Sequence, residues 1–146
     1  AQDGAAFLRL GVLYSRKSEF EDSFAAFDKA ENIYDRQSDD EGVAEVKIQR
    51  GISFNSQEKL DLARRQFEQV LAIPRANKYQ KIKALLQISS ACSSEGKTSC
   101  GEEYASNAIN LAREERMENL ATGGLIDLGN AYFTRAEYEK AERYFQ

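Results

Sequence analysis

The stretch LGVLYSRKSEFEDSFAAF, residues 10–27, returns near the end of the chain as LGNAYFTRAEYEKAERYF, residues 128–145. Both stretches contain Leu-Gly, a Tyr three residues after the Gly, a Glu-aromatic-Glu triplet and a closing Phe. Two weaker copies lie between them, so the anchor positions Gly11, Gly51, Ser89 and Gly129 are separated by 40, 38 and 40 residues. A nearly constant period along the whole chain predicts an array of stacked structural repeats.

Each copy contains two helical patterns. In the first copy, Phe7, Leu10 and Tyr14 fall on one helical stripe, and a second apolar stripe begins at Phe20. Ser18 followed three residues later by Glu21 indicates a capping box at the start of the second helix. The sequence therefore predicts eight helices, near residues 4–17, 19–36, 40–56, 60–73, 78–95, 99–115, 118–135 and 138–146.

Small residues in the pattern predict close contacts between paired helices. Gly11 lets the returning helix approach, and the third copy changes two positions together, with Cys92 in the aromatic position and Gly101 in the alanine position. We interpret this double change as one local repacking. Cys92 then stays a buried free thiol in the core, as free cysteines in cores usually do, and a disulfide with Cys100 is the less favoured alternative.

Composition limits the possible functions. Of 146 residues, 42% are hydrophobic and 30% charged, and the net charge is −4, which fits a soluble globular protein and disfavours nucleic acid as a partner. No apolar run reaches the ~20 residues that cross a bilayer. The chain has no His and only two Cys. We therefore predict no catalytic, cofactor or metal site, no membrane contact and a cytoplasmic location.

The fourth copy resembles the tetratricopeptide repeat (TPR) family. The family's pattern is matched without a gap by Leu128, Gly129, Tyr132, Ala141 and Phe145. The first copy matches with Ser23 in place of the Ala. The period of about 40 residues is similar to that of the kinesin light chain repeats. The general run of residues over 112–145, rather than a single motif, resembles TPR regions attached to bacterial serine/threonine protein kinases.

The resemblance implies an all-α fold, a right-handed α-α superhelix of four helical hairpins with the last one truncated. We expect a single domain over 1–146, with repeats near 4–38, 39–77, 78–117 and 118–146. Because the last copy stops within its second helix and the chain begins without Met, we expect a segment of a longer protein.

The resemblance also implies that the first helices of the hairpins line a concave groove that holds a peptide or helix. A second stripe on these helices supplies the predicted groove residues: Leu8, Val12, Ile48, Ile52, Asn55, Leu86, Ser90, Ile126, Asn130 and Phe133. The alternative, that this stripe only packs one first helix against the next, remains open.

We accordingly expect a non-catalytic scaffold that binds a protein or peptide partner. The alternative is a regulatory or sensory segment of a larger bacterial serine/threonine kinase whose catalytic domain lies outside this chain. A third expectation is self-association through the truncated C-terminal helix, where Tyr138, Ala141, Tyr144 and Phe145 form an incompletely covered apolar face.

Overall fold

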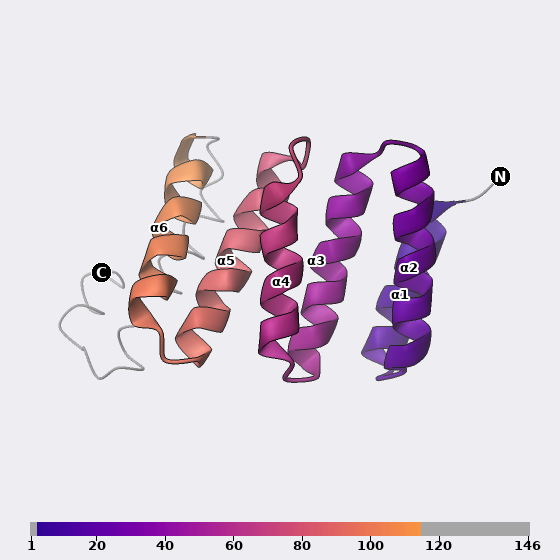
Figure 1. Ribbon diagram of the computed structural model, residues 1–146, viewed down its shortest axis with the longest axis horizontal. Helices are drawn as coiled ribbons and strands as arrows, with labels where there is room; N and C mark the ends of the chain where they lie inside the picture. Colours follow the sequence, from indigo (N-terminus) through magenta and orange to yellow (C-terminus); the bar gives the residue numbers. More distant parts are fainter. Residues whose placement is uncertain (1–2, 115–146) are drawn as a thin grey trace. The chain divides into compact units, whose positions relative to one another are not determined.

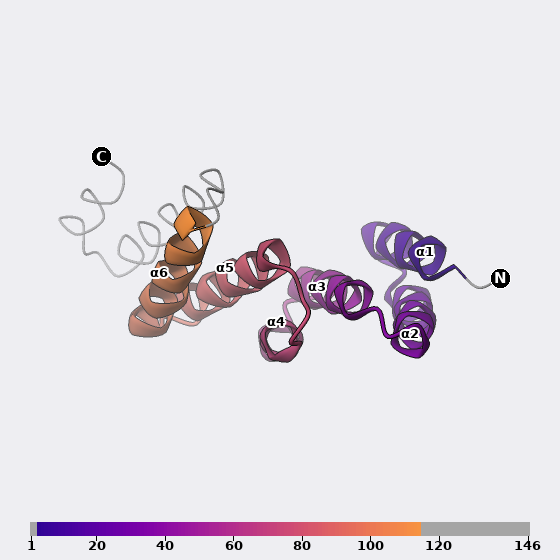
Figure 2. The same ribbon diagram turned by 90° about the horizontal axis from the view of Figure 1, so that it is seen from above.

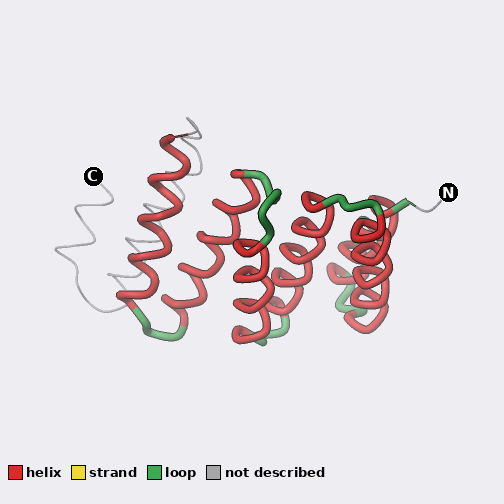
Figure 3. Tube along the Cα trace, turned by 45° about the horizontal axis from the view of Figure 1, so that its top comes forward, coloured by secondary structure: helices red, strands yellow, loops and turns green. Residues whose placement is uncertain are grey.

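The computed structural model describes residues 3–114, which form six α-helices and no strand (Figures 1 and 3). The helices are α1 (Gly4–Arg16), α2 (Phe20–Arg36), α3 (Asp40–Ser56), α4 (Leu60–Ala72), α5 (Lys78–Ser94) and α6 (Thr98–Glu114). Every end lies within one residue of the predicted position, which confirms the all-α prediction for this part of the chain. The predicted helices at 118–135 and 138–146, with the apolar face from Tyr138 to Phe145, lie outside the described residues.

The chain divides into two compact units, residues 1–77 and residues 78–146. In the first unit α1 pairs with α2 and α3 pairs with α4, while α3 also contacts α1 and α2 (Figure 2). In the second unit α5 pairs with α6. Each described pair is therefore one helical hairpin, and the first unit contains two stacked hairpins.

Left-handed residues end four of the helices. Ser18, Ser38, Glu58 and Gly96 have φ values of 61°, 54°, 60° and 75°. In each turn the next N–H donates to the carbonyl five residues back, as Glu19 does to Tyr14 at 2.9 Å. This is the Schellman arrangement, which satisfies carbonyl groups left unpaired at a helix end.

The capping box predicted at Ser18 is wrong for the same reason. An N-cap residue needs a non-helical backbone with negative φ, usually extended, whereas Ser18 is left-handed and closes α1. The N-cap of α2 is Glu19, which forms no side-chain capping bond. Pro74, in contrast, acts as its sequence position indicates, because α4 ends at Ala72 and Ile73 is already extended.

Glycine lets the helices of the first two hairpins approach. A Cβ atom added at Gly11 would lie 2.5 Å from the Phe27 ring, and one added at Gly51 would lie 2.6 Å from the Phe67 ring. Both rings are fully buried. The prediction of close approach at Gly11 is confirmed and extends to Gly51, and in both hairpins the buried Phe fills the space that the missing side chain leaves.

The third hairpin solves the same packing problem with different residues. Ser89 takes the place of the glycine, and Ala105 takes the place of the Phe, sixteen residues further on in each hairpin. The Ser89 hydroxyl donates to the Gly101 carbonyl at 2.8 Å, whereas in the first hairpin the Ser23 hydroxyl donates to the Gly11 carbonyl at 2.7 Å. The hydrogen bond persists, but its donor and acceptor have exchanged helices.

A disulfide joins Cys92 on α5 to Cys100 on α6, with their Cα atoms 5.8 Å apart. The expectation that Cys92 stays a free thiol is therefore wrong. Its burial is as predicted, because the residue is fully buried. The tight turn between the helices brings the two backbones within the usual disulfide span of about 4.4–6.8 Å, a distance that the sequence did not define.

Replacement of Gly51 by Ala should lower the free energy of unfolding by about 1–3 kcal/mol, because the new methyl group overlaps the buried Phe67 ring. Urea denaturation followed by circular dichroism measures the change. In the double variant G51A/F67L the two costs should be less than additive, since the smaller side chain makes room. Strictly additive costs would show that the methyl group and the ring do not compete for space.

Replacement of Glu58 by Gly should raise the free energy of unfolding by about 1 kcal/mol, because an L-residue in the left-handed region bears a steric cost that Gly avoids. Gly96→Ala is the reverse experiment in the third hairpin, where a Cβ would meet nothing within 4 Å. It should therefore be destabilising through backbone strain alone. A destabilised Glu58→Gly variant would contradict this account of the turns.

Candidate functional site

An open groove with a volume of about 420 Å³ lies between α1 and α3. Residues of both helices line it: Leu8, Arg9, Val12, Leu13, Arg16, Glu45 and Gln49. All of them belong to the first helices of the two hairpins in the first unit. The groove thus forms where the stacking of one hairpin on the next brings two first helices side by side.

Apolar side chains of α1 form one wall of the groove. Leu8 and Val12 also pack against the buried cluster of Phe27, Ala30 and Val46, so both are held in place from behind. Leu13 is 48% exposed. The wall therefore combines two anchored side chains with one that remains largely accessible to a ligand.

Polar and charged groups complete the groove. On α3, the Gln49 amide donates to the Glu45 carboxylate at 3.1 Å. On α1, Arg9 and Arg16 are exposed, seven residues apart and on the same side of the helix. Positive charge therefore lies on one wall and a carboxylate on the other, with the apolar side chains between them.

The predicted groove residues have different environments. Leu8 and Val12 line the groove, whereas Ile48 is fully buried and lies beyond the reach of a ligand in this conformation. Ile52 and Asn55 on α3 are half-buried. In the second unit, Leu86 is half-buried and Ser90 is exposed on α5. Ile126, Asn130 and Phe133 lie outside the described residues.

Leu8 and Val12 pack between helices and also line the groove, and a role for them in binding stays a prediction. Sequence reasoning missed Arg9, Leu13, Arg16 and Gln49. A signal was present, since Arg9 and Gln49 occupy the same position in successive repeats, 40 residues apart. A wider stripe, extended to this position, would have included both.

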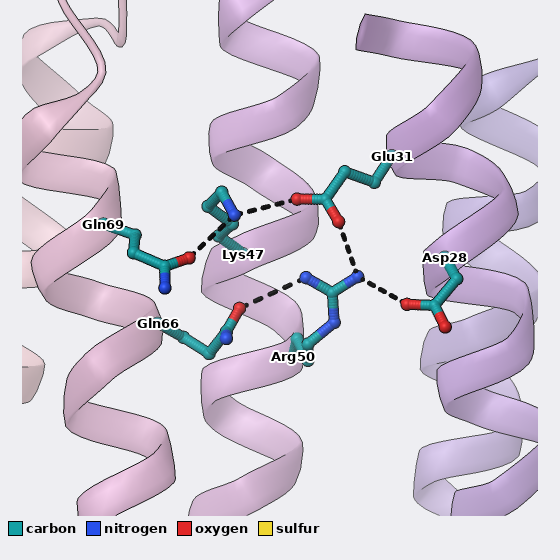
Figure 4. Close-up of polar contacts among 6 residues, drawn as sticks. All are labelled: Asp28, Glu31, Lys47, Arg50, Gln66 and Gln69. Atoms are coloured by element: carbon teal, nitrogen blue, oxygen red, sulfur yellow. Dashed lines mark hydrogen bonds and ion pairs between the residues drawn. The ribbon is translucent and has the colours of Figure 1, made fainter.

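A network of charged and amide side chains joins α2, α3 and α4 (Figure 4). We call it the Arg50 network. The Arg50 guanidinium contacts Asp28 at 3.0 Å, Glu31 at 3.1 Å and the Gln66 side chain at 3.2 Å. Lys47 contacts Glu31 and the Gln69 side chain, both at 2.8 Å. Arg50 is only 7% exposed, so these partners compensate for its burial.

Glu31 is the anion that both cations of the network share. Burial raises the pKa of Glu31, but the hydrogen bonds and positive charges of Lys47 and Arg50 outweigh burial and hold that pKa below its usual value. The ionised form is thus favoured in the folded state. This charge pairing joins α2 of the first hairpin to α3 of the second hairpin.

The stability of the chain should fall in acid partly through Glu31. The pKa of Glu31 is lower in the folded chain than its ordinary value of 4.5. Ionised Glu31 therefore stabilises the fold at pH values above 4.5, and this stabilisation is lost as the pH falls through the folded pKa. Glu31→Gln should flatten the dependence of the melting temperature on pH between about pH 5 and pH 3.

Asp28→Asn is the matched control, because the Asp28 side chain is 69% exposed and water screens its contact with Arg50. This variant should keep most of the acid dependence of the unmodified chain. Equal flattening in both variants would show that Glu31 has no special part in the acid response.

Comparisons with known proteins place these observations in a family. No helix in the described part of the chain combines the length and the apolar character needed to cross a membrane. A comparison with curated proteins found no match. The model of the tetratricopeptide repeat family matches residues 3–76, which comprise both hairpins of the first unit and the groove between them. With half of its length matched and with helical hairpins at the expected positions, the chain belongs to the tetratricopeptide repeat family.

Proposed function

We propose that this chain is a protein-interaction scaffold that holds a peptide or helix of a partner in the groove between α1 and α3. Tetratricopeptide repeats generally mediate contacts between proteins, and they typically do so without catalysis. The observation that supports this site is the groove itself, where an exposed Leu13 adjoins the anchored Leu8 and Val12. An apolar side chain of a ligand would cover Leu13 and remove it from water.

The chemistry of the walls favours an amphipathic ligand. One apolar side chain would lie against Leu8, Val12 and Leu13, and polar groups on either side would meet Arg9 and Arg16 on one wall and Gln49 on the other. Burial of one such anchor contributes about 1.5–3 kcal/mol. Several contacts of that size are needed for micromolar affinity, which corresponds to about 8 kcal/mol.

The same groove would serve a regulatory or sensory segment of a larger kinase, and that role stays a prediction from the sequence. The cytoplasmic location and self-association through the C-terminal helix also stay predictions. Binding through Ile52 and Asn55 belongs to the proposal as well, since both lie on the same helix as Gln49, whereas binding through Leu86 and Ser90 of the second unit stays a separate prediction from the sequence.

Leu13→Asp should weaken the binding of a ligand at least tenfold, because a charge replaces an apolar contact of more than about 1.4 kcal/mol. A ligand is obtained by selecting peptides from a random displayed library against the whole chain, and the selected peptide is then titrated by fluorescence anisotropy. Leu13 is half exposed, so the variant should melt close to the temperature of the unmodified chain.

Leu62→Asp provides the matched control. Leu62 is 40% exposed on α4, and it does not line the groove. This substitution makes the same chemical change at a similar exposure, so the affinity should be unchanged. A peptide that binds normally to Leu13→Asp but loses affinity for Leu62→Asp would move the binding site from the groove to the second helices.

A further inference from the structure

The third hairpin lacks the aromatic side chains that fill the first two. Cys92 stands where the first hairpin has Tyr14 and the second has Phe54. At the crossing point of the helices, Ala105 stands where the other hairpins have a fully buried Phe. The pair α5–α6 therefore has smaller side chains at two successive levels, and the covalent link between Cys92 and Cys100 lies at one of them.

The two cysteines differ in their exposure to solvent. Cys92 is fully buried in α5, whereas Cys100 is partly exposed near the start of α6. Between them lies the turn in which Gly96 has a φ of 75° and the Lys97 N–H donates to the Cys92 carbonyl at 2.8 Å. A reagent in solution can thus reach Cys100, while Cys92 is shielded behind it.

We propose that Cys92 and Cys100 form a reversible redox pair that exchanges with small thiols and disulfides of the glutathione type, and that its state controls the opening of the α5–α6 hairpin. This inference concerns the second unit and does not depend on the proposed groove. In a reducing compartment such a pair is open at rest and closes under oxidation.

The exchange balances without a further reactant. The Cys100 thiolate attacks one sulfur of glutathione disulfide, and the first glutathione leaves as a thiolate. The Cys92 thiolate then attacks the Cys100 sulfur of the mixed disulfide and expels the second glutathione. The protons of the two cysteine thiols end on the two glutathione molecules, and the two cysteines are oxidised as glutathione disulfide is reduced.

The reverse reaction begins at the same exposed atom. A glutathione thiolate attacks the Cys100 sulfur, and Cys92 leaves as a thiolate that takes up a proton. A second glutathione then releases Cys100 and carries away the oxidising equivalents as glutathione disulfide. Without the link, small residues and the hydrogen bond from Ser89 to Gly101 hold this level of the hairpin. The turn around Gly96 should then open more often.

Hydrogen exchange of the whole chain tests this inference, measured once in glutathione disulfide and once in excess glutathione. The amide of Lys97, which bonds to the Cys92 carbonyl, should exchange about tenfold faster in the reduced chain. The equivalent amide of Glu19, in the turn of the first hairpin, bonds to Tyr14 and should not respond. It serves as the internal control.

Intact-protein mass measured in the oxidising buffer should show the loss of two hydrogens, and Cys100→Ser should exchange as the reduced chain does in both buffers. If glutathione disulfide yields only mixed disulfides, the pair does not close and the inference is wrong. Equal exchange at Lys97 in both buffers, with the link formed, would show that closure does not control the hairpin. The unmodified chain decides both questions even if the variant fails to fold.

Discussion

The close contact between a glycine on the first helix and a buried Phe on the second is the constraint on which the first unit depends. A Cβ at Gly11 or Gly51 would lie 2.5–2.6 Å from a ring carbon, a separation at which atoms overlap. The helices can cross at this distance only because one side supplies no side chain and the other supplies a flat ring. Each hairpin thus becomes a rigid element of fixed thickness, and a second hairpin can stack on it.

The groove follows from that stacking. Val46 of the second hairpin packs against Phe27 and Ala30 of the first, and Leu8 and Val12 pack against the same cluster. The Arg50 network adds polar contacts between the second helices and α3. The apolar contacts hold α1 beside α3, and the Arg50 network holds α3 beside α2, so the groove is built from packed helices.

The third hairpin shows that the crossing can be built in another way. Ser89 occupies the glycine position and Ala105 occupies the Phe position, so the side chains at this crossing fill less volume than in the first two hairpins. These two changes keep small residues where the helices cross. They also change what the hairpin depends on, from the burial of aromatic rings to a hydrogen bond and a link between two cysteines.

The sequence by itself determined the positions of the six described helices, the close approach at Gly11 and the end of α4 before Pro74, because periodicity and backbone sterics act within a few residues. It did not determine that Ile48 is buried while Leu13 is exposed, that Ser18 is left-handed, or that Cys92 meets Cys100. Nor did it reveal the partners of Arg50. The tertiary structure decided these features, because burial, turn geometry and pairing across helices depend on residues that only the packing of one helix on another brings together.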